Sequence, residues 1–269
     1  MCGICGIYNS NHMDGALTIS LMSRILRHRG PDDEGYVAIS TMGGISTPLG
    51  GADSRVLLPD ISGFNKGADL YLAHRRLAII DLSAAGHQPM SSADGRIWIV
   101  FNGEIYNYRE LRSELRSRGH VFRTETDTEV VIAAYVEWGE ECLDRFEGMW
   151  AFVLYDAHRN ALFGSRDRFG VKPLYYVFDQ GRFAFASEIK SLLAVPGVRA
   201  RANGSAIYDY IAFGQDYWSD GATFFDSVYE LRPSHAFLWK IGHTSFETYR
   251  YYSLPVCEEW ESFDGHRAQ

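Results

Sequence analysis

The sequence opens with MCGICGIY (residues 1–8), in which one cysteine directly follows the first methionine and a second cysteine comes three residues later. Two cysteines separated by two residues are typical of zinc and redox sites. A cysteine at position 2 has another use, because removal of Met1 would leave Cys2 with a free α-amino group beside its own thiol. The first interpretation predicts a metal or redox protein, and the second predicts an N-terminal nucleophile.

The cysteine pattern does not favour the metal or redox interpretation. The chain has four cysteines, at positions 2, 5, 142 and 257, and no second CxxC pair. A structural zinc site needs four ligands, and a thioredoxin-like pair belongs to a βαβ pattern. Residues 3–8 instead have the apolar character of a short buried strand, in which Cys5 is a small core residue. We therefore expect no metal site.

Composition restricts the class of protein. The 269 residues are 46% hydrophobic and 22% charged, with a net charge of −8. This is the composition of a globular domain, and its acidic balance argues against a nucleic-acid partner. The longest apolar runs, such as residues 149–155, are too short to cross a membrane. Because no signal-peptide pattern opens the chain and the cysteines are scattered, the sequence predicts a cytoplasmic protein without membrane contact.

Three helices and one long loop are expected in the first half of the chain. Apolar periodicity predicts a helix within 15–30, stopped by Gly30-Pro31, whose core-facing side chains are Leu17, Leu21, Met22 and Ile25. A Gly-, Ser- and Pro-rich stretch at 40–68 indicates a surface loop or insertion.

The other two helices of the first half have clear start and stop signals. The helix after Asn107 has that residue as N-cap and Glu110 as its capping-box partner, and it ends at Gly119. The helix of residues 127–139 is capped by Asp127 and closed by Gly139.

Strands follow one another in the second half. Runs of β-type residues separated by turn signals predict closely spaced strands between residues 149 and 188, two short helices, and a last antiparallel pair from 235–241 and 246–252. Strands in runs with helices grouped between them predict an α+β layered fold with antiparallel sheets. Trp150, Phe152 and Leu154 alternate as expected for a sheet face packed on another sheet.

A nucleophile at Cys2 would need further groups. The α-amine, with a pKa of about 7.7–8.0, can serve as its base. Asn102 and Gly103 could form an oxyanion hole from one side-chain amide and one backbone N–H, or simply a tight Asn-Gly turn. Arg76 could bind a carboxylate and Asp127 an ammonium group, or they could be a surface ion pair and a helix cap.

With these residues in place, the sequence resembles the class II glutamine amidotransferase domain, and most closely that of glutamine-dependent asparagine synthetases. The resemblance covers residues 1–253 with motifs in family order. The motifs are MCGICGIY, RHRGPDDEG, LAHRRLAIIDLS, GHQPM, VFNGEIYNYRELR, TDTEVVIAAY, FEGMWAFVLYD, RDRFGVKPLYY, FASEIKSLL and YDYIAFG.

The resemblance implies a fold and a set of roles. The fold would be the N-terminal-nucleophile hydrolase fold, a four-layer αββα sandwich of two antiparallel sheets flanked by helices, with Cys2 opening a central strand. Cys2 would be the nucleophile, and Asn102 and Gly103 the oxyanion hole. The groups that bind glutamine would be Arg76, Asn102, Gly103, Glu104 and Asp127. Arg27 and Gly30 would order the segment beside the nucleophile, and RDRFGVKPLYY would serve the fold and the face toward a synthetase domain.

The expected reaction is hydrolysis of L-glutamine to glutamate and ammonia for an ATP-dependent amidation, with aspartate as the leading acceptor. The alternatives are an amidohydrolase of this fold that acts on another amide, or a non-catalytic regulatory domain. Residues 254–269 would begin a linker to the synthetase domain, whose pyrophosphate loop is not in this sequence. ATP and Mg²⁺ are expected only there, no cofactor is expected in residues 1–253, and a homodimer is one possible assembly. Two departures from the family are the long 40–68 segment and LRPSHAFLW in place of a Pro-Pro-Gly-His turn.

Overall fold

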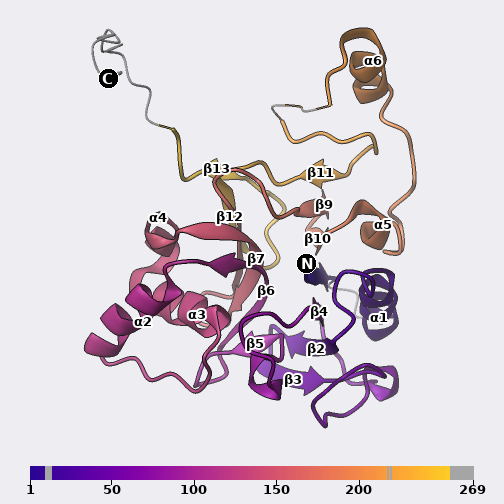
Figure 1. Cartoon of the computed structure of the whole chain (residues 1–269). Helices are drawn as coiled ribbons and strands as arrows, with labels where there is room; N and C mark the ends of the chain where they lie inside the picture. The colour runs from indigo at the N-terminus through magenta and orange to yellow at the C-terminus, as the bar shows by residue number, and fades with distance from the viewer. Residues whose placement is uncertain (10–13, 217, 219, 255–269) are drawn as a thin grey trace, which may run out of the picture.

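A computed structural model describes residues 1–9, 14–216, 218 and 220–254 (Figure 1). Within them the strands form two antiparallel sheets. The first is seven-stranded, in the order β11 (Tyr229–Glu230), β9 (Tyr175–Asp179), β10 (Arg182–Ala186), β1 (Gly3–Tyr8), β4 (Leu70–Arg76), β2 (Asp33–Ser40) and β3 (Ile45–Leu49). The strand that follows Cys2 is therefore central in its sheet, as expected.

The second sheet is six-stranded. Its order is β13 (Tyr249–Arg250), β12 (His235–Lys240), β8 (Ala161–Arg166), β7 (Gly148–Asp156), β6 (Ile97–Ile105) and β5 (Met90–Ser91). The predicted last antiparallel pair is present as β12 and β13, with His235 opposite Arg250.

Helices cover the outer face of each sheet. Against the first sheet lie α1 (Gly15–Ile25) and α5 (Ile189–Leu192), and against the second lie α2 (Tyr108–Ser117), α3 (Asp127–Trp138) and α4 (Cys142–Arg145). A further helix, α6 (Gly204–Phe213), is drawn apart from both sheets in Figure 1. Short 3₁₀ turns occupy Ile61–Gly63, Ala84–Gly86 and Gly139–Glu141.

Three apolar cores separate these layers. The middle core lies between the sheets and takes one face of β1, with Ile4 and Tyr8, together with side chains of β6, β7, β10 and β12. The opposite face of β1 carries Cys5 and Ile7, which pack with Ile19 and Met22 of α1. The third core joins the second sheet to α2, α3 and α4. The predicted four-layer αββα sandwich is confirmed.

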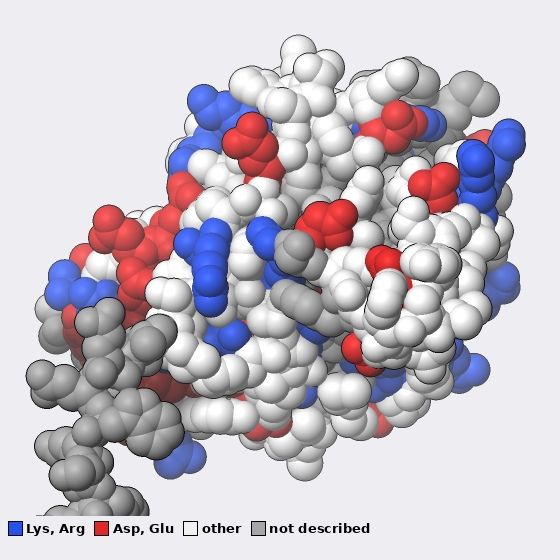
Figure 2. Space-filling model, turned by 90° about the horizontal axis from the view of Figure 1, so that it is seen from above, with Lys and Arg blue, Asp and Glu red and all other residues white. Residues whose placement is uncertain are grey.

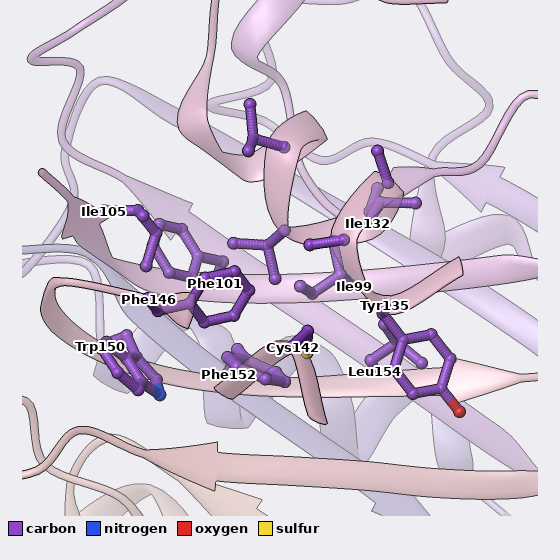
Figure 3. Packing of buried hydrophobic residues seen from close by; sticks show 14 of the residues in the cluster. Ile99, Phe101, Ile105, Ile132, Tyr135, Cys142, Phe146, Trp150, Phe152 and Leu154 are labelled. Carbon is purple, nitrogen blue, oxygen red and sulfur yellow. The ribbon is translucent and has the colours of Figure 1, made fainter. Parts of the chain in front are cut away.

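The predicted facing of β7 is wrong. Trp150, Phe152 and Leu154 belong to the core beneath the helices, among Phe146 and residues of α3 (Figure 3), whereas Ala151, Val153 and Tyr155 face the other sheet. Both faces of this strand are buried, so alternation of large side chains could not identify which face meets the second sheet.

The helix α1 differs from its prediction in both face and end. It stops at Ile25, and its buried side chains are Thr18, Ile19, Met22 and Ser23, whereas Leu17 is 62% exposed. The buried stripe includes the small polar residues that fit beneath the helix. Of the four predicted core-facing side chains, Met22 is buried and Leu21 and Ile25 are half-buried, so the prediction fails at Leu17.

Two further local predictions need correction. The 40–68 segment is not only a loop, because Ile45–Leu49 form β3 at the edge of the first sheet. Asn107 does precede α2, but its side chain makes no capping bond to the helix. It instead donates to Arg145 O at 2.9 Å and accepts from Glu147 N at 3.1 Å, which ties α2 to the segment before β7.

The surface of the described residues carries charges of both signs. On the face shown in Figure 2, acidic and basic side chains are interspersed among uncharged ones. None of the helices in the described part of the chain has the length and apolar character needed to cross a membrane.

Candidate active site

All six residues predicted for the site line one pocket. Cys2, Arg76, Asn102, Gly103, Glu104 and Asp127 surround a cavity of about 100 Å³. They come from the start of β1, the end of β4, the second half of β6 and the first turn of α3. The loop after β4 forms another wall, with Leu77, Ile79, Ile80, Asp81, Gly86 and Gln88. The fold thus brings together residues separated by up to 125 positions.

The Cys2 thiol lies against the backbone of Leu77. Leu77 N–H donates to Cys2 Sγ at 3.4 Å, and Sγ lies 3.6 Å from Leu77 O. Cys5 packs beneath α1 in a different core, so the two cysteines of MCGICGIY do not share an environment. Among the described residues no cluster of His, Cys, Asp and Glu side chains could hold a metal ion.

Burial raises the pKa of the Cys2 thiol above its ordinary value, and four neighbours act against that effect. They are the Leu77 N–H, the chain amino group, Arg76 and Lys172. A thiol in this position needs a base to become a nucleophile, since burial favours its neutral form.

The residue that fixes the backbone at Cys2 is Arg29, not Arg27. Arg29 Nε donates to Cys2 O at 2.9 Å, and its Nη1 pairs with Glu188 at 3.0 Å. Arg27 is directed away, toward Asp53 of the 40–68 segment, with Nε 2.9 Å from Oδ2. Gly30 is needed for close approach, because a Cβ there would lie 2.3 Å from the backbone of Arg75.

The second half of β6 lines the same pocket as the thiol. Tyr106 N–H donates to Glu147 O, so the N–H groups of even-numbered residues in this part of β6 point toward β7. Because N–H directions alternate along an antiparallel strand, the N–H groups of odd-numbered residues point away from β7. There Phe101 N–H bonds Gln88 Oε1 at 2.8 Å, and Ile105 N–H bonds Asp127 Oδ2 at 3.0 Å. Gly103 lies between them, and no hydrogen bond among the described residues uses its N–H.

Asn102 supplies a second free donor. The residue is 1% exposed, and its Nδ2 is buried without a hydrogen-bond partner among the described residues. Leaving such a group unpaired costs about 1–3 kcal/mol, which an anionic oxygen in the pocket would offset. The Asn-Gly pair lies within β6 and is not a turn, which removes the structural alternative for these two residues.

Sequence reasoning missed two residues that hold this edge in place. Gln88 bridges Phe101 N–H and Thr128, donating to Thr128 Oγ1 at 3.2 Å. His74 Nε2 lies 3.0 Å from Phe101 O, and burial lowers the pKa of His74 to about 3, so the neutral ring donates this bond. The GHQPM motif contained Gln88, but spacing alone gave no sign of its contact with β6.

The Arg76 guanidinium is buried and bonds the following loop. Its Nη1 donates to Ser83 O at 2.7 Å and its Nη2 donates to Asp81 O. Gly86 allows this approach, because a Cβ there would lie 2.0 Å from Nη2. Arg76 therefore shapes the pocket wall, and it is not a surface ion pair.

Asp127 is not a helix cap. Thr126 is the N-cap of α3, and its side chain accepts from Glu129 N–H, whereas Asp127 is the first residue of the helix. Asp127 is 5% exposed, and burial together with the charge of Glu104 raises its pKa to about 6. Its carboxylate faces the pocket and accepts from Ile105 N–H, so it can also receive a cationic group.

Comparisons with known proteins agree with this geometry. A family model described as a glutamine amidotransferase domain matches residues 57–252. The chain is 34% identical to the glutamine-hydrolyzing asparagine synthetase 3 of Bacillus subtilis (strain 168), over 98% of this chain and 38% of the relative. It is 38% identical to Amidase chry2 of Gibberella zeae, over 66% of this chain and 26% of the relative.

Solved structures share the fold. Glutamine phosphoribosylpyrophosphate amidotransferase from Bacillus subtilis superposes with a TM-score of 0.66 at 20% identity, over 95% of this chain and 50% of that chain. The chain thus spans between about a quarter and a half of the length of these proteins.

Proposed function

The chain belongs to the glutamine amidotransferase domain family, and from that premise we propose that Cys2 hydrolyses the side-chain amide of glutamine. The ammonia would serve an ATP-dependent amidation, with aspartate as the acceptor. The observation that carries the proposal is the pair of donors in the pocket of the Cys2 thiol, Asn102 Nδ2 and Gly103 N–H, which have no partner within the part of the chain that the structure describes.

The proposed reaction uses groups of this chain in two stages. After Met1 is removed, the α-amino group of Cys2 takes the thiol proton, and the sulfur attacks the amide carbon of glutamine. Asn102 and Gly103 receive the oxygen that becomes negative. The amino group then returns the proton to the departing nitrogen, which leaves as ammonia. Water hydrolyses the resulting thioester to glutamate and restores the thiol.

The ends of the substrate are assigned to three charged groups. Arg76 would hold the α-carboxylate, and Glu104 and Asp127 the α-ammonium group. Arg76 already gives two donors to the loop after β4, so in this proposal the same guanidinium joins that loop to the substrate.

The proposed partner is an ATP-dependent synthetase domain, in which ATP and Mg²⁺ would bind. The assignment of 1–253 to the amidotransferase domain and of 254–269 to a linker stays a prediction, and residues 255–269 lie outside the described part of the chain. The cytoplasmic location and the homodimer also stay predictions.

Asp127→Asn separates ammonium binding from backbone support. Asparagine keeps an oxygen for the Ile105 N–H but loses the negative charge. We expect the KM for glutamine to rise about 10- to 150-fold, the equivalent of about 1.5–3 kcal/mol for a charge-assisted hydrogen bond. Steady-state kinetics measures this change, and an unaltered KM would remove Asp127 from the substrate site.

The raised pKa of Asp127 gives two controls for this variant. In the parent protein, KM should rise as the pH falls through about 6, because Asp127 gains a proton there, and the variant should lose that dependence. Burial raises the folded-state pKa above the ordinary 3.8, so this group favours folding most below pH 3.8 and loses that contribution as the pH rises through 6. At pH 7 the variant should therefore unfold at the same temperature as the parent or higher.

A panel of amides tests the proposed function. We expect release of ammonia from L-glutamine, and much slower release from amides that lack the α-carboxylate or the α-ammonium group. One relative is named an amidase, and preference for an amide other than glutamine would favour an amidohydrolase without a synthetase partner. No hydrolysis of any amide by protein whose N-terminus is Cys2 would favour a regulatory domain.

A further inference from the structure

Lys172 is a buried cation in the pocket of Cys2. It lines the pocket and is only 7% exposed. Both backbone polar groups of Lys172 are hydrogen-bonded: the N–H donates to Asp167 Oδ2 at 3.0 Å, and the C=O accepts from Arg166 Nε at 2.7 Å. Among the described residues, however, no hydrogen bond or ion pair uses its ammonium group. The ammonium group therefore stays available to an anion that shares this pocket during the reaction.

The loop that carries Lys172 is held rigidly. Arg166 donates to Gly170 O at 2.8 Å and to Leu231 O at 2.7 Å, in addition to Lys172 O. The Asp167 carboxylate accepts from the N–H groups of Phe169, Val171 and Lys172, and also from Trp150 N–H, which lies opposite Gly103. The motif RDRFGVK is therefore a fixed support that joins Lys172 to the strand pair of the oxyanion hole.

The charges around the Cys2 sulfur show what Lys172 can act on. The positive groups of residues that line the pocket are the chain amino group, Arg76 from β4 and Lys172. Arg29 bonds the Cys2 carbonyl. The acidic residues that line the same pocket are Asp81 from the loop after β4, Glu104 from β6 and Asp127 from α3. Both guanidinium ends of Arg76 are bonded to loop carbonyls, so Lys172 is the pocket-lining side chain whose positive charge is least committed.

We propose that Lys172 is a positioning residue for the Cys2 nucleophile. The ammonium group of Lys172 balances the negative charge of the Cys2 thiolate. This inference rests on the proposed function in taking Cys2 as the nucleophile. The proton that leaves Sγ goes to the chain amino group, and Lys172 takes no part in that transfer. The nearby positive charge favours the charged form of the sulfur against the effect of burial.

The test measures the acidity of the Cys2 thiol directly, without any turnover. The rate of Cys2 alkylation by iodoacetamide is followed against pH in the full chain, by tandem mass spectrometry of the N-terminal peptide, which separates Cys2 from Cys5 and leaves Cys257 out. In Lys172→Met we expect the thiol pKa to rise by about one pH unit and alkylation below that pKa to slow about tenfold. Lys172→Arg should restore most of the rate, because it keeps the charge.

Controls separate this role from a structural one. Lys240→Met removes an exposed cation outside the pocket and should leave the alkylation profile unchanged. Thermal unfolding of each variant checks the fold, and Lys172→Gln gives a second neutral side chain if the methionine variant is unstable. An unchanged thiol pKa in a folded neutral variant would overturn the proposal, and a raised KM for glutamine in that same variant would assign Lys172 to the substrate carboxylate instead. If the parent protein does not hydrolyse glutamine, that result counts against the proposed function alone, because alkylation is measured without substrate.

Discussion

Protein that keeps a residue in front of Cys2 is expected to lose glutaminase activity while its fold stays intact. In such protein the α-nitrogen of Cys2 is an amide and cannot take the thiol proton. Losing a positioned general base costs about 10²–10⁴ in rate. Burial strengthens the effect here, because it raises the pKa of the thiol and so makes the base necessary. Met1 also lines the pocket, where it would compete with substrate for a small space.

A removable leader that ends directly before Cys2 makes this comparison within one polypeptide. Uncut protein should hydrolyse glutamine at least about 100-fold more slowly than the same sample after cleavage. Mass spectrometry defines the N-terminus of each sample, and circular dichroism with thermal unfolding checks the fold. Equal turnover before and after cleavage would refute the role of the α-amino group as base. Cys2→Ser in the cleaved form is a matched control, since it keeps the amine and replaces only the thiol.

Periodicity and turn signals predicted an α+β fold with antiparallel sheets because they reflect local physics, whereas the order of the four layers came from the family resemblance. The sequence patterns were less successful wherever two faces of one element are both buried. In β7, Phe152 and Val153 are each fully buried on opposite sides, so only the partners of the strand decide which face meets the other sheet. In α1, Leu17 is exposed and Ser23 is buried, where the Ser23 hydroxyl accepts a hydrogen bond from Arg75 Nε at 3.0 Å.

Local signals also gave incomplete accounts of individual side chains. Asn107 stands at the start of α2, as predicted, yet its amide bonds the backbone of Arg145 and Glu147. Asp127 sits one residue inside α3, where Thr126 is the cap. The capping rule assigned the side chains of Asn107 and Asp127 to the helix ends, but each one forms hydrogen bonds with a segment distant in the sequence.

The candidate site divides in the same way. Cys2, Asn102 and Gly103 could be proposed because their chemistry follows from residue type and position. Gln88 and Lys172 could not, because their roles depend on contacts between distant segments: Gln88 bonds Phe101 across the pocket wall, and Lys172 reaches the pocket of Cys2 from a loop after β8. Arg29 was missed for a simpler reason, since RHRG offers two arginines and only the packing distinguishes them.

Asn102→Ala is expected to lower kcat about 10²–10³-fold, the usual effect of removing one oxyanion-hole donor. The structural reason is specific to this site. Asn102 Nδ2 is buried without a partner among the described residues, so its hydrogen bond is available to the oxygen that becomes negative during attack. Alanine fits the strand position, where Asn102 lies opposite Ala151, and the pairing of β6 with β7 should persist. The KM for glutamine should change much less than kcat, since the bond is strongest in the transition state.

The neighbouring donor cannot be tested as cleanly, which makes Asn102 the informative position. A Cβ on Gly103 would lie 2.3 Å from Met149 O and 2.8 Å from Trp150 Cα, so Gly103→Ala would disturb the strand pair itself. Asn102→Asp is the matched control, because it keeps the shape of the side chain and replaces the donor with an acceptor. Aspartate should lower kcat at least as far as alanine does, since its charge opposes that of the developing oxyanion. Steady-state kinetics and thermal unfolding of both variants decide the matter: a kcat that stays at the parent value in a folded Asn102→Ala protein would leave this side chain without a part in the reaction.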